Sequence, residues 1–267
     1  MRAHRIARSG DDFLVRLSVD DMLERLSLVA RPFERACALF AGTPYLAERL
    51  EASPQVERVD RLEEGVGESG ATPDAPGLRP ATYDLVCAPL ALHGAVDLPG
   101  ALIQVARALK PDGLLLASLP GPRTLQELRA VLLEAEAEVT GGAAQRVDLF
   151  AEVRDAGALL QRAGLALPVA DTDVHVVRYG AFGNLVADLR RMGATYPDPH
   201  PGNRATFARA AALYAERFAD PDGRLRATFE HVSLSGWSPH ASQQKPLRPG
   251  SAKARLAEAL GTVETKA

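Results

Sequence analysis

A histidine and a pair of aspartates are the side chains of this sequence best suited to chemistry. His93 lies in the run L-A-L-H-G, where a side chain of this type could contact a ligand or act as a general base. A loop histidine packed over a sheet is an equally good interpretation. Asp171 and Asp173 flank Thr172 and would point to one face of an extended strand. Two acids on one face could hold a metal ion or an arginine substrate, although a solvated strand edge is the simpler interpretation.

A second group of candidates lies near the carboxyl terminus, in the polar, proline-containing stretch G-W-S-P-H-A-S-Q-Q. Its Trp237, His240 and Gln243 could form a surface for a substrate or a protein partner, because an indole ring offers both an apolar face and a hydrogen-bond donor. The alternative is that the tryptophan anchors the tail to the core. The sequence leaves both interpretations open.

Charge and cysteine content exclude several kinds of site. The formal net charge is −3 over 267 residues, so no basic field favours nucleic acid or an anionic membrane. Cys37 and Cys87 lie in apolar runs without C-x-x-C spacing, which predicts two buried thiols and no metal site. The sequence contains no H-E-x-x-H, P-loop or G-x-S-x-G motif. Since no stretch approaches the ~18 apolar residues of a membrane span and no signal-peptide pattern is present, we expect a soluble, cytoplasmic protein.

Apolar runs alternate with amphipathic segments, which predicts an α/β fold with a mostly parallel, doubly wound sheet. We expect one α/β domain at 36–245, a helical segment at 1–35 before it and a polar tail at 246–267. The glycine- and proline-rich stretch 63–81 is predicted to be an exposed loop. The expected strands are 36–42, 55–60, 83–87, 114–119, 168–179 and 226–238, and the expected helices are 18–31, 43–53, 98–109, 124–140, 155–165, 182–192 and 204–218.

Several motifs carry a resemblance to known families. The runs Y-D-L-V, A-L-H and L-K-P-D-G resemble the second half of class I S-adenosylmethionine (SAM) methyltransferases, including the malonyl carrier-protein methyltransferases. The runs G-P-R-T-L-Q-E-L-R, A-D-T-D, A-D-L-R-R-M-G-A-T and G-W-S-P-H-A-S-Q-Q-K-P-L-R-P-G-S-A resemble the methyltransferase-like assembly factor 5 family of mitochondrial NADH:ubiquinone oxidoreductase (complex I) and its alphaproteobacterial relatives. The resemblance extends from about residue 36 to residue 256. It implies a Rossmann-like fold with helices on both faces and a C-terminal elaboration.

The resemblance also implies a SAM site. Carried over by position, its cofactor-binding residues would be Gly42, Asp60, Asp84, Leu92 and His93, with Asp60 placed at the end of the second strand to bind ribose hydroxyls. The family pattern at the end of the first strand is acid-x-Gly-x-Gly-x-Gly. Of these four positions, only the second glycine is kept here, and the others are occupied by Ala38, Phe40 and Pro44.

The function implied by the resemblance is action on a protein substrate during assembly of complex I. In mitochondrial members that action is described as hydroxylation of an arginine on a core subunit, whereas bacterial members are described as SAM-dependent methyltransferases. In-line transfer of a methyl group would need mainly positioning and a desolvated pocket. The alternative is a catalytically silent scaffold that has lost SAM binding, which predicts a pocket occluded at Phe40 and Pro44. Methylation of a small molecule or an acyl carrier is a third possibility.

Overall fold

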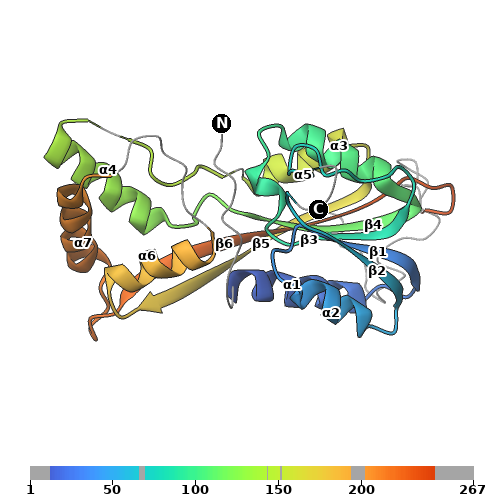
Figure 1. Ribbon diagram of the computed structural model, residues 1–267, viewed down its shortest axis with the longest axis horizontal. Coiled ribbons are helices and arrows are strands. Elements are labelled where there is room, and N and C mark those ends of the chain that lie inside the picture. The colour runs from blue at the N-terminus through green and yellow to red at the C-terminus, as the bar shows by residue number, and fades with distance from the viewer. Residues whose placement is uncertain (1–12, 66–69, 143, 151, 194–201, 244–267) are drawn as a thin grey trace, which may run out of the picture.

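The computed structural model describes residues 13–65, 70–142, 144–150, 152–193 and 202–243 (Figure 1). Within these residues one six-stranded sheet has the order β2-β1-β3-β4-β6-β5. The strands are β1 Phe33–Leu39, β2 Val56–Leu62, β3 Tyr83–Ala88, β4 Leu109–Pro120, β5 Ala166–Tyr179 and β6 Leu225–Trp237. The helices are α1 Phe13–Ser27, α2 Tyr45–Glu51, α3 Leu98–Ala108, α4 Gln126–Thr140, α5 Val153–Arg162, α6 Phe182–Arg191 and α7 Arg204–Phe218, with a 3-10 turn at Leu92–Gly94.

Strand pairing confirms the expected mostly parallel sheet. β1 pairs in parallel with both β2 and β3, and β3 pairs in parallel with β4. β6 is antiparallel to β4, and β5 is antiparallel to β6. The chain proceeds from β1 to β2 on one side and to β3 and β4 on the other, so the order reverses between β1 and β3. In open α/β sheets, ligands bind beyond the carboxyl ends of strands at such a reversal.

Each face of the parallel part of the sheet carries its own apolar layer, because successive side chains on a strand point to opposite faces. Figure 1 shows α1 and α2 on one face and α3 and α5 on the other. Ala36 and Ala38 of β1 pack in the cluster that includes α1 and α2, whereas Cys37 and Leu39 pack in the cluster that includes α3 and α5. The near-continuous apolar runs of the sequence therefore reflect strands that are buried on both faces.

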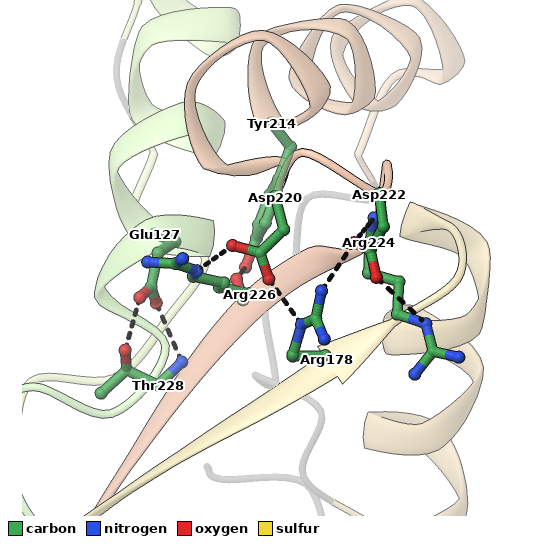
Figure 2. A network of polar contacts seen from close by, with 8 residues as sticks. All are labelled: Glu127, Arg178, Tyr214, Asp220, Asp222, Arg224, Arg226 and Thr228. Atoms are coloured by element: carbon green, nitrogen blue, oxygen red, sulfur yellow. Dashed lines mark hydrogen bonds and ion pairs between the residues drawn. The ribbon is translucent and has the colours of Figure 1, made fainter.

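The antiparallel pair β5–β6 extends beyond the parallel strands and carries α4, α6 and α7 at its far end (Figure 1). Figure 2 shows the polar contacts there: Asp220, which follows α7, accepts hydrogen bonds from Arg178 of β5 and Arg226 of β6. Nearby, the carboxylate of Glu127 accepts from the backbone N–H and the hydroxyl of Thr228. This region is the C-terminal elaboration that the sequence predicts.

Element boundaries differ from expectation in two places that matter for the site. β1 begins at Phe33, so the expected division between residues 35 and 36 falls inside this strand. β2 continues past Asp60 to Leu62, which moves the end of the second strand two residues further along the chain. The expected tail at 246–267 lies outside the described residues.

Both cysteine thiols should resist modification in the folded protein. Cys37 and Cys87 are 0% and 1% exposed, and burial raises the pKa of Cys37 well above its ordinary value and that of Cys87 to about 12. Because the thiolate is the reactive form, neither should react with Ellman's reagent at pH 8 until the chain is unfolded in guanidinium. Rapid reaction of either thiol in the native protein would contradict this placement.

Candidate functional site

The carboxyl ends of β1 and β2 meet at Gly42. The N–H of Gly42 donates to Oε2 of Glu63 over 3.1 Å, and Arg61 binds the other oxygen of this carboxylate at 2.6 Å. Glu63 directly follows β2 and was not among the residues that the sequence singled out. The register that pairs Leu39 with Leu62 brings it beside the loop after β1. A carboxylate at this place is suited to binding ribose hydroxyls.

Phe40, the first residue after β1, has an unusual backbone and a buried ring. Its φ is +50°, a left-handed conformation that is a genuine outlier for a bulky side chain and costs about 1–3 kcal/mol. Only 3% of the residue is exposed, and it belongs to the same apolar cluster as Ala71 and Leu92. Phe40 is therefore packed into the core among apolar side chains.

The loop after β3 has a similar conformation. Leu90 has a φ of +46°, and its N–H donates to the hydroxyl of Ser118 in β4 over 2.9 Å. The Ser118 hydroxyl also contacts that of Ser18 in α1 at 2.6 Å, and both serines are 0% exposed. Two neighbouring strand ends thus carry left-handed residues other than glycine at the point where the strand order reverses.

Leu92 and His93 lie in the short turn that follows, on the same edge of the sheet as Phe40. Leu92 is fully buried in the apolar cluster, so its place is in the core. The ring of His93 is partly buried and packs edge-to-face against Phe150, with ring centres 6.2 Å apart. Of the expected cofactor residues, the structure thus brings Gly42, Leu92 and His93 to one edge.

The expectation that Asp84 binds the cofactor is wrong, because this residue lies at the amino-terminal ends of the parallel strands. It is the second residue of β3, and its carboxylate accepts the backbone N–H groups of Glu34 and Arg35 at the start of β1, both over 2.8 Å. Residues at the starts of parallel strands lie far from the crevice at their carboxyl ends. Asp84 therefore fastens β1 to β3 and cannot contact a ligand beside Gly42.

Asp60 also differs from expectation. It lies inside β2 opposite Cys37, and its carboxylate binds Arg35 of β1 at 2.9 Å and 2.7 Å. This ion pair directs the carboxylate back toward the start of β1. Glu63, three residues later, occupies the position at the strand end that the sequence assigned to Asp60.

The three candidate residues near the carboxyl terminus lie at the amino-terminal ends of the parallel strands, where β4 begins: Trp237, His240 and Gln243. Trp237 pairs with Leu114, packs against the cluster beneath α1, and has the guanidinium of Arg31 5.8 Å from its ring centre. The Gln243 amide donates to Asp112 Oδ1 over 2.9 Å, whereas the exposed His240 contacts Ser242 at 2.7 Å. These contacts favour the interpretation that the tryptophan anchors the chain end, and they place all three residues away from Gly42.

The motif G-P-R-T-L-Q-E-L-R, which begins directly after β4 and resembles the assembly-factor family, also has a role in the fold. The N–H of Gly121 donates to the carbonyl of Glu230 over 2.9 Å, and the Thr124 hydroxyl donates to the same carbonyl over 3.0 Å. A Cβ added at Gly121 would lie 2.5 Å from the Glu230 carboxylate, so a larger residue there would displace this side chain. The motif therefore secures the loop after β4 to β6.

A polar row crosses the sheet face beneath α1. Arg25 donates from its two terminal nitrogens to the two oxygens of Asp171, both over 2.7 Å, and from Nε to Asp21 over 2.8 Å. Ser233 of β6 donates to Asp21 over 2.7 Å and lies 3.2 Å from Nδ1 of His231. The arginine held by Asp171 is thus the chain's own. Across the described ranges, no cluster of three potential metal ligands occurs.

Acidification from pH 7 to pH 5 should lower the free energy of unfolding through His231. Burial lowers the pKa of this imidazole; Asp21 and Asp173 oppose the shift, while His175 and Arg25 add to it. Because the unfolded chain binds the proton first, near pH 6.5, the stabilisation is complete above that pH and is lost as pH falls through the folded-state pKa. In His231→Gln, the free energy of unfolding, measured by denaturant titration at each pH, should change less between pH 7 and pH 5 than in the wild type. The exposed control His240→Gln should keep the wild-type slope, and equal slopes in all three proteins would contradict the assignment.

The residues around Gly42 do not fit SAM as they are folded. A SAM loop needs glycines for close backbone approach and an acid for the cofactor's amino group. Here Ala38 has no carboxylate, and the buried Phe40 stands where the family pattern has its first glycine. The Glu63 carboxylate, beside the N–H of Gly42, is suited to the ribose hydroxyls.

Comparison with known proteins shows which protein families this chain resembles. No family model matches it. It is 34% identical over 251 residues to the mitochondrial arginine-hydroxylase NDUFAF5 of Danio rerio, an alignment that covers 88% of this chain and 78% of that protein. A malonyl-[acyl-carrier protein] O-methyltransferase of Methylovorus sp. is 30% identical over 251 residues, covering 84% of this chain and 82% of that one.

The YcgJ protein of Bacillus subtilis, a solved structure, superposes with a TM-score of 0.56 at 14% identity and covers 84% of this chain and 99% of that one, a likeness of fold. No helix in the described segments is both long and apolar enough to cross a membrane. The architecture confirms the expected Rossmann-like class I methyltransferase fold. The sequence similarity shows that the chain belongs to the family of the arginine-hydroxylase NDUFAF5.

Proposed function

We propose that this protein serves the assembly of respiratory complex I by binding an arginine-bearing segment of a partner subunit, on a methyltransferase fold that no longer seats SAM. Membership in the NDUFAF5 family suggests both the role in complex I assembly and an arginine as the group that is recognised. The observation that carries the binding role is Phe40, a residue only 3% exposed at a position where the family pattern has a glycine. A protein with this loop keeps the methyltransferase fold but lacks the glycines that would let the cofactor come close to the loop backbone.

A second candidate is SAM-dependent modification of the same protein substrate. The carboxylate of Glu63 favours it, since it lies 3.1 Å from the N–H of Gly42 in a position suited to ribose hydroxyls. Catalysis would require Phe40 to leave its buried position. The two candidates thus differ in whether Glu63 matters for function.

The test is deletion of the gene in its own host, followed by complementation with the wild type or with Glu63→Gln. On native gels, complex I should decline in the deletion strain and be restored equally by both proteins, because binding does not use Glu63. Mass spectrometry of the isolated peripheral arm adds a direct readout of arginine peptides carrying an added methyl group or an added oxygen atom.

The outcomes separate the candidates. Unaltered complex I in the deletion strain would refute the role in assembly. Failure of Glu63→Gln to restore complex I, together with an arginine modification that appears only with the wild type, would replace the scaffold role with catalysis. An added methyl group would then indicate methyl transfer, and an added oxygen would indicate hydroxylation.

A further inference from the structure

β5 is an unusually long strand at the edge of the sheet. It comprises fourteen residues, Ala166–Tyr179, and pairs with β6 along one side for nearly its whole length. In the part of the chain that the structure describes, no strand pairs with its other side (Figure 1). Edge strands of this length expose backbone N–H and C=O groups that can pair with another extended chain.

The two faces of β5 differ in character. Asp171 and Asp173 share the face beneath α1, because their partners on β6, Ser233 and His231, point to that side. On the opposite face, Val174 and Val176 are 39% and 54% exposed. A strand added beside β5 would meet carboxylates on one face and branched apolar side chains on the other.

The acidic face already binds a guanidinium group. Arg25 engages Asp171 through two parallel hydrogen bonds of 2.7 Å, the geometry in which arginine recognises carboxylates. Asp173, two residues further along the same face, is exposed and makes no hydrogen bond or ion pair with the described residues. Opposite it, the Nε2 atom of the buried His231 has no hydrogen-bond partner in the described ranges.

We infer that the outer edge of β5 is a docking site for an extended segment of a partner protein that adds to the sheet as a further strand. The segment alternates in character: an arginine faces Asp173, and β-branched apolar residues face Val174 and Val176. Backbone hydrogen bonds supply affinity, and the alternating side chains supply specificity. This inference rests on the proposed function, from which it takes the arginine-bearing partner.

The test uses the purified protein and a short synthetic peptide that alternates valine with arginine. We expect saturable binding, with hydrogen-exchange protection of backbone amides confined to 167–179. Asp173→Asn should weaken binding about threefold to fivefold, as for loss of one exposed ion pair. The double variant Val174→Ser, Val176→Ser should weaken it further, whereas Val96→Ser, a matched change at a valine that is 77% exposed elsewhere, should not.

Control peptides make the test specific. Replacing arginine by lysine should reduce affinity, because an ammonium group cannot make the two-point contact. Methylating alternate backbone nitrogens should abolish protection, because those groups can no longer donate. Absence of saturable binding, binding without protection of β5, or equal binding by Asp173→Asn would each overturn the inference.

A concentration-dependent dimer that disappears in the double valine variant would assign the edge to a second copy of the chain and also overturn it. The peptide experiment does not involve complex I. Loss of complex I on deletion without peptide binding would therefore remove only the docking site. Peptide binding with unaltered complex I would remove only the role in assembly.

Discussion

Replacing Asp84 by alanine is expected to lower the free energy of unfolding by about 3 kcal/mol. The residue is 7% exposed, and its carboxylate accepts two backbone N–H groups at the start of β1. The substitution removes the charged acceptor of two partly buried hydrogen bonds, and a hydrogen bond to a charged group contributes about 1.5–3 kcal/mol. Denaturant unfolding, followed by circular dichroism, measures the change.

Two further variants calibrate this prediction. Asp84→Asn keeps one acceptor oxygen and should be destabilised less than the alanine variant. Asp97→Ala removes the side chain that caps α3 by accepting from Gly100 at 2.9 Å, and should cost about 1 kcal/mol. Wild-type stability in Asp84→Ala, combined with weaker ligand binding, would show that this aspartate serves a ligand instead of the fold.

Replacing Phe40 by glycine is expected to bring the affinity for S-adenosylhomocysteine from below calorimetric detection into the measurable range, a gain of at least about tenfold, equivalent to about 1.4 kcal/mol. The change removes the ring from the end of β1 and restores glycine at a φ of +50°. It should also lower the free energy of unfolding by about 2 kcal/mol, since the lost packing of about 3–5 kcal/mol exceeds the strain relieved. Calorimetric titration and denaturant unfolding measure the two effects.

Phe40→Ala is the matched control, because it opens the same space but keeps a Cβ at the left-handed position. It should be less stable than the glycine variant and should bind more weakly. A folded glycine variant with no gain in affinity would show that Ala38 and Pro44, and not the ring, have removed the cofactor site.

Much of the fold could be predicted from the sequence because its strands are buried on both faces. Runs such as Y-D-L-V-C-A stand out in composition, and the periodic helices between them imply parallel crossovers. Helix ends were less predictable: Ser18 has the character of a cap, yet Phe13 already belongs to α1 and Ser18 is a buried interior residue bonded to Ser118. A serine hydroxyl can serve either role, and sequence alone does not reveal a partner one hundred residues away.

The candidate site was less predictable, because it depends on register and on distant partners. Placing Glu63 beside Gly42 requires knowing that Leu39 pairs with Leu62. The sequence offered Asp171 as a possible ligand of a metal ion or an arginine substrate, or as part of a solvated edge, whereas its carboxylate binds Arg25 of the same chain, 146 positions away in sequence. Motif positions also mislead where they serve the fold, as Asp84 does.

The most direct test of the closed cofactor loop is calorimetric titration of the purified wild-type protein with SAM and, separately, with S-adenosylhomocysteine. Phe40 replaces the first glycine of the loop and Ala38 offers no carboxylate, so we predict no saturable heat from either compound with a well-folded sample. Micromolar binding of either one would contradict the account. It would show that the altered loop still seats the cofactor and would favour the catalytic candidate.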